Sequence, residues 1–127
     1  MNKNSIYPIE VNEQSTLSNL QQLFNEVYPY LKISFYTKSF DPKNNLRLKL
    51  IDQTDKNIIS FLKKEIKEVR FLISANLSVS QLNQIFLENI GLNVLVHRNS
   101  GRLWLQINDT DSWSLEEQNK QGQELCA

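Results

Sequence analysis

The stretch LSVSQLNQIFLENIGLNVLVHRNSGRLWLQ, residues 77–106, decides the fold because it predicts one helix followed by two strands. Ser78 and Gln81 have the spacing of a capping box, in which each side chain accepts the other residue's backbone N–H at a helix start. Gly91 suits the left-handed residue that ends such a helix. A buried stripe of Leu, Ile and Phe recurs at helical spacing between them. We therefore expect a helix over 78–90.

The two following segments, 92–97 and 103–108, alternate in the way that strands do and are expected to form a hairpin. The Asn-Ser-Gly sequence between them is turn chemistry, since glycine accepts a positive φ. A three-residue turn would place Val96 opposite Trp104. A four-residue loop would shift the pairing by one position and bring Trp104 beside His97.

Both faces of this hairpin carry apolar side chains, so each face needs cover. In the three-residue register Val94, Val96 and Trp104 share one face, and Arg98 and Arg102 lie at its rim. Helices are expected to cover one side. The N-terminal arm and C-terminal tail of the same chain, a second copy, or a small ligand would cover the other. The interaction residues expected from this argument are Val94, Val96, His97, Arg98, Arg102, Trp104 and Trp113.

The remaining elements follow from the same periodicities and from capping and turn residues. In residues 46–51 Leu alternates with Arg and Lys, which suits a strand but leaves a helix open. The other expected elements are a helix at 15–28, a strand at 31–37, a helix at 54–67, a strand at 69–75 and a short helix from Ser114 to Gly122.

Mixed helices and hairpins without regular βαβ alternation indicate the α+β class. We expect a single, mostly antiparallel sheet of about 4–5 strands, with three main helices packed on it and a short C-terminal helix. The domain organisation expected is an N-terminal arm at 1–14, an α+β domain at 15–109 and a C-terminal tail at 110–127.

Composition narrows the function classes further. The 127 residues hold 14 Lys plus Arg and 14 Asp plus Glu, so no net field attracts nucleic acid or an acidic membrane. No apolar run approaches the ~20 residues that span a bilayer, and the N-terminus does not resemble a secretory signal. Cys126 is the single cysteine, which excludes an intramolecular disulfide and favours a cytoplasmic location.

Candidate chemistry is sparse. One His and one Cys cannot supply the usual zinc ligand sets, and the Asp109–Asp111 pair lacks the rest of a calcium loop. The three glycines form no phosphate-binding motif. His97 is the one possible imidazole base, and a His on a strand is typically a packing residue. We therefore expect no catalytic residue, metal or cofactor, although the sequence does not exclude an enzyme.

Three stretches carry a resemblance: LSNLQQLFNEVYPYLKISFY at 17–36, the segment at 77–106, and TDSWSLEEQNKQG at 110–122. They share a Gly-Leu-Asn-Val, Ser-Gly, Trp and Thr-Asp-x-Trp-(Ser/Thr)-Leu-x-x-Gln-Asn signature. In this the chain resembles a family of small bacterial proteins, chiefly from Bacteroidetes, that has no assigned biochemical role. The resemblance implies an α+β domain in a bacterial cytoplasm and transfers no catalytic residue.

The leading functional hypothesis is a non-enzymatic protein-interaction module that forms a homo-oligomer through the hairpin face around Val94, Val96 and Trp104. The alternative is a small-ligand-binding protein, or an enzyme, with a groove lined by both tryptophans, His97 and Arg98. Binding of single-stranded nucleic acid is a third hypothesis. It rests on two groups of basic residues: Lys43, Arg47 and Lys49, expected near the aromatic Phe35 and Tyr36, and Lys63, Lys64, Lys67 and Arg70. A solvated charged face is the default interpretation of these basic residues.

Overall fold

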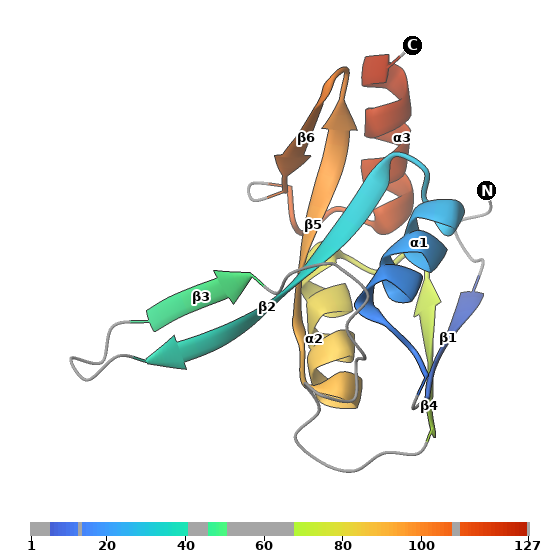
Figure 1. Ribbon diagram of the computed structural model, residues 1–127. Coiled ribbons are helices and arrows are strands. Elements are labelled where there is room, and N and C mark those ends of the chain that lie inside the picture. Colours follow the sequence, from blue (N-terminus) through green and yellow to red (C-terminus); the bar gives the residue numbers. More distant parts are fainter. Residues whose placement is uncertain (1–5, 13, 41–45, 51–67, 108–109, 127) are drawn as a thin grey trace.

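The chain has an α+β fold, and its described residues form two antiparallel sheets and three helices (Figure 1). The computed structural model describes residues 6–12, 14–40, 46–50, 68–107 and 110–126. In chain order the elements are β1 (Ile6–Asn12), α1 (Leu17–Val27), β2 (Leu31–Phe40), β3 (Leu46–Leu50), β4 (Glu68–Ser74), α2 (Val79–Ile90), β5 (Asn93–Ser100), β6 (Leu103–Gln106) and α3 (Leu115–Cys126). The predicted class is confirmed, whereas the helix expected at 54–67 lies outside the described residues.

The expected single sheet is wrong, because β1 and β4 form a two-stranded sheet of their own. The other four strands follow the order β3-β2-β5-β6. Helix α2 contacts both sheets: the Phe86 ring meets Phe35 of β2 at 5.9 Å and Phe71 of β4 at 5.2 Å between centroids, both edge-on. The N-terminal segment expected as an arm thus supplies the strand that pairs with β4 on the far side of α2.

Local signals place the helix ends as expected. The Ser78 side chain accepts the Gln81 N–H at 3.2 Å, and the Gln81 side chain accepts the Ser78 N–H at 2.9 Å. Gly91 ends α2 in the left-handed region with φ 72°. Thr16 and Asn19 form a second capping box at the start of α1. These ends depend on neighbouring residues alone, which is why the sequence predicts them.

The register of the closing hairpin differs from both expectations. Ser100 pairs with Leu103 and Asn99 with Trp104, so the turn consists of two residues, Gly101 and Arg102. Gly101 has φ 65°, the positive value that two-residue hairpin turns require at their first central position. Trp104 therefore does not lie opposite Val96 or beside His97 in register.

Helix α3 runs through Gly122 to Cys126 and does not end at the glycine as predicted. A Cβ atom at Gly122 would lie 2.7 Å from the Tyr30 Cβ and 3.3 Å from the Arg98 Cγ. The glycine thus lets the helix approach the sheet closely. The N-terminal cap is as expected on one side, since the Ser114 hydroxyl accepts the Glu117 N–H at 3.1 Å.

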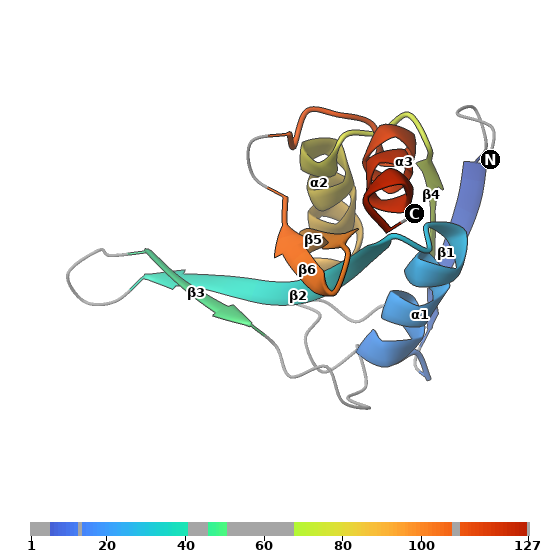
Figure 2. The ribbon, with the colours of Figure 1, turned by 90° about the horizontal axis from the view of Figure 1, so that it is seen from above.

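The helices cover the larger sheet unevenly. Figure 2 shows α2 and α3 on one side of β2, β5 and β6, while α1 lies along β2 on another side. The far part of β2 extends away from the helices together with β3 in both ribbon views (Figures 1 and 2). None of the three described helices is long and apolar enough to span a membrane.

Candidate functional site

The alternation of β5 divides the residues expected at the interaction face. Val94 and Val96 are 3% and 1% exposed and belong to the core on the side of α2 and α3. Trp104 pairs with Asn99 and therefore lies on the opposite face, together with His97. The prediction that Val94, Val96 and Trp104 share a face is wrong, and the two valines offer no surface to a partner.

Strand β6 forms one edge of the larger sheet and pairs with β5 alone within the described residues. Its sequence, Leu-Trp-Leu-Gln, contains no charge. Leu103 and Leu105 are 64% and 50% exposed, while Trp104 is half-buried. Most proteins avoid exposed apolar side chains on an edge strand, because such a strand can pair with a strand of another chain.

The backbone of this edge has a defined direction. The Asn99 N–H donates to the Tyr30 carbonyl of the loop before β2, and the Ile107 N–H donates to the Val96 carbonyl of β5, each at 2.9 Å. The backbone N–H and C=O of Asn99 therefore point toward β2. The backbone groups of its register partner Trp104 point in the opposite direction, away from β5. The N–H and C=O of Trp104 consequently face outward from the sheet edge.

Arg98 links the hairpin to α3. Its Nη1 donates to Gln118 Oε1 at 2.8 Å, and its guanidinium carbon lies 5.9 Å from the centre of the Trp113 ring. Gln118 is completely buried, and its amide nitrogen also donates to the carbonyl and hydroxyl of Thr110. Trp113 is 39% exposed, and Leu105 is the register partner of Arg98 on β6.

The exposed apolar residues around Arg98 form what we call the apolar patch: Leu103, Leu105 and Trp113. Arg102 lies exposed at the adjacent turn. Tryptophan and arginine together are typical of the energetic centres of protein interfaces.

The opposite face of the hairpin carries Lys32, His97 and Trp104. Lys32 Nζ lies 4.8 Å from the centre of the Trp104 ring, and Lys32 is the register partner of His97. Burial lowers the pKa of His97, and the charge of Lys32 lowers it further. The His97 Nδ1 atom is buried and has no hydrogen-bond partner in the described part of the chain.

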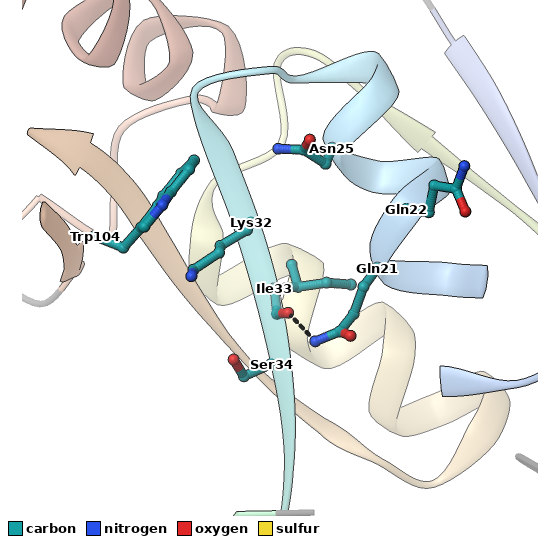
Figure 3. A pocket seen from close by; sticks show the side chains of 7 residues that line it. All are labelled: Gln21, Gln22, Asn25, Lys32, Ile33, Ser34 and Trp104. Carbon is teal, nitrogen blue, oxygen red and sulfur yellow. Dashed lines mark hydrogen bonds between the residues drawn. The ribbon is translucent and has the colours of Figure 1, made fainter. Parts of the chain in front are cut away.

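A hollow of about 460 Å³ adjoins this face, between α1 and the sheet (Figure 3). Gln21 and Asn25 of α1 donate to the carbonyls of Ile33 and Leu31 at 2.8 and 2.9 Å. The described residues that line it are Gln21, Gln22, Asn25, Lys32, Ile33, Ser34 and Trp104. Apart from Trp104, none of these was expected as a site residue; their one signal in the sequence is the cluster of amides on the polar face of the first helix.

The groove expected between both tryptophans, His97 and Arg98 is not formed, since Arg98 and Trp113 lie on the α3 side and His97 and Trp104 on the other. The described residues also contain no group of three or more His, Cys, Asp or Glu that could hold a metal ion. The lysines of the 54–67 segment lie outside the described residues, so nucleic-acid binding stays a prediction.

No family model, curated protein or solved structure matches the chain. The resemblance to the bacterial family therefore stays a prediction, and function must be argued from the residues themselves.

Proposed function

We propose that the protein is an interaction module that self-associates, two copies pairing edge to edge through β6. The observation that carries the proposal is an uncharged edge strand with two half- to two-thirds-exposed leucines and the outward backbone groups of Trp104. Among the described strands only β5 pairs with β6. The outer side of such a strand is a template for another strand, and β-strand addition is a common mode of recognition.

A second copy suits this edge because the strand is complementary to itself. A two-fold axis perpendicular to the sheet, passing through Trp104, would pair the two strands antiparallel and keep each face on its own side. Leu103 would then lie opposite Leu105 of the partner subunit, on the face of the apolar patch. The equal numbers of acidic and basic residues add no net repulsion between copies.

The length of β6 limits the strength of this association. Stable dimers bury about 800 Å² on each partner. A strand of four residues with a small patch beside it offers less contact than that. We therefore expect a reversible dimer whose population changes with concentration, in contrast to an obligate one.

Sedimentation velocity over a dilution series tests the proposal. The wild-type protein is expected to shift from monomer toward dimer with rising concentration, and Leu105→Lys to stay monomeric, because a charge on the edge opposes pairing. Leu72→Lys is the matched control: Leu72 of β4 is 52% exposed, close to the 50% of Leu105, but belongs to the other sheet. A wild-type monomer at all concentrations, or dissociation by Leu72→Lys alone, would refute pairing through β6.

A further inference from the structure

The hollow between α1 and the sheet has the size and chemical variety of a ligand site. Its volume of about 460 Å³ falls within the range of roughly 300–1,000 Å³ found for small-molecule pockets. One wall is an α-helix and the opposite wall is the face of a sheet, so both walls are regular elements. Sites built on such elements hold their groups more exactly than sites on loops do.

The helical wall presents fixed hydrogen-bond acceptors. The amide nitrogens of Gln21 and Asn25 are committed to the carbonyls of Ile33 and Leu31. Each amide thereby keeps its orientation, and among the described residues no group donates to either side-chain oxygen. Carbonyl oxygens held in this way suit a ligand that brings its own donors, such as hydroxyl groups.

The sheet wall presents an aromatic ring, a hydroxyl and a cation. In Figure 3 Lys32 lies between Trp104 and the amides of α1, with Ser34 farther along the same strand. Among the described residues, no carboxylate lines the hollow and Lys32 forms no ion pair. The ammonium group rests over the Trp104 ring, an arrangement that an incoming anion can displace.

We infer that this hollow binds a hydroxylated ring that carries one anionic group, that is, a sugar acid or a sugar phosphate. The anionic group would pair with Lys32, the C–H face of the ring would lie on Trp104, and the hydroxyls would donate to Gln21 and Asn25. Each feature of the walls then has a counterpart in the ligand. A neutral sugar would leave Lys32 unpaired, and a simple carboxylate would leave the amide oxygens and the ring unused.

Tryptophan fluorescence of the Trp113→Phe variant tests the inference, since it leaves Trp104 as the sole indole of the two in the chain. The probes are D-glucuronate and D-glucose 6-phosphate, which distinguish the carboxylate from the phosphate, with D-glucose, acetate and AMP as comparisons. We expect a saturable change with at least one of the two anionic sugars, and binding at least about tenfold weaker for D-glucose and acetate.

Lys32→Met keeps the length of the side chain and removes its charge, so it is expected to abolish the preference for the anionic sugar over D-glucose. Lys120→Met, on the exposed side of α3, is the matched control and should leave that preference unchanged. A non-saturating response to both anionic sugars, equal binding of D-glucose, tighter binding of AMP, or no effect of Lys32→Met would each overturn the inference.

A second readout does not depend on fluorescence or on any substitution. His97 is the one histidine of the chain, so its imidazole resonances in an NMR titration need no assignment. An anion bound at Lys32 offsets the charge that lowers the His97 pKa, and the pKa should therefore rise when the anionic sugar is present. An unchanged His97 pKa at saturating anionic sugar would place the ligand away from Lys32 and contradict the inference.

Discussion

Replacing Gln118 with leucine should destabilise the protein strongly although it puts an apolar side chain into a buried position. Gln118 accepts a hydrogen bond from Arg98 and donates two to Thr110, and its side chain is fully buried. A net contribution of about 1 kcal/mol for each neutral bond and about 1.5–3 kcal/mol for the bond from the charged Arg98 sums to roughly 4 kcal/mol. Burial of the leucine offsets about 1 kcal/mol of this loss.

The expected decrease in the free energy of unfolding is therefore about 3 kcal/mol, a large share of the ~5–15 kcal/mol typical of a domain. Urea unfolding followed by circular dichroism measures it, and with a slope of about 1–3 kcal/mol/M the midpoint should fall by about 1–3 M at an unchanged slope. Gln121→Leu on the same helix is the matched control. Gln121 is only partly buried, and its amide donates to Glu117 one helical turn away at 3.3 Å. Helical pairs of this spacing contribute about 0.2–0.5 kcal/mol, so its loss should cost under about 1 kcal/mol.

A double-mutant cycle shows whether the loss runs through Arg98. Adding Arg98→Met to Gln118→Leu removes the guanidinium that the first substitution leaves without its acceptor, so the double variant should be more stable than the sum of the two single losses predicts. Strict additivity, or a loss from Gln118→Leu no larger than that from Gln121→Leu, would refute the argument that Gln118 ties α3 to the hairpin.

Three further predictions concern other buried groups. In a thermal melt, Tyr28→Phe should leave the free energy of unfolding unchanged or raise it by about 1 kcal/mol. The Tyr28 hydroxyl is buried and has no hydrogen-bond partner in the described part of the chain. A clear loss of stability would show that the hydroxyl is hydrogen-bonded. Gly122→Ala should lower the melting temperature despite the better helix propensity of alanine, because the new Cβ would lie 2.7 Å from the Tyr30 Cβ; a higher melting temperature would contradict this. The pKa of His97 is lower in the folded protein than the ordinary 6.5, so the unfolded chain binds the proton more readily and stability should fall as the pH drops below about 6.5. In His97→Gln the urea midpoint should therefore change less with pH in this range. An unaltered pH dependence would assign it to other titratable groups.

The sequence predicts those features that depend on adjacent residues. The reciprocal bonds of Ser78 and Gln81 and the positive φ of Gly91 need nothing beyond the helix they delimit, and both are as expected. The register of the hairpin is different. Gly101 can serve in turns of two, three or four residues, and alternating apolar side chains on both faces gave no preference among the registers.

Features that depend on distant contacts were the ones the sequence did not predict. The pairing of β1 with β4 joins segments about sixty positions apart, and the sequence of neither strand indicates with which strand it pairs. The hollow is formed because α1 packs along β2. In this position the side-chain amides of Gln21 and Asn25, on the surface of α1, donate hydrogen bonds to backbone carbonyls of the strand. Amides of this kind on an isolated helix would simply be solvated.

The outer strands of the larger sheet are β3 and β6, and the first half of β2 also forms an edge because β3 pairs only with residues 36–40. Where β3 does not reach, at residues 31–35, the edge of β2 is met by α1, whose amides bind the carbonyls of Leu31 and Ile33. That edge has been given polar partners from within the chain. At β6 the described residues supply no such helix, and Trp104 turns its backbone outward between two exposed leucines. Side chains of the same chain thus occupy the edge at residues 31–35 of β2, whereas among the described residues none does so at β6, whose uncharged, apolar edge is available for another strand.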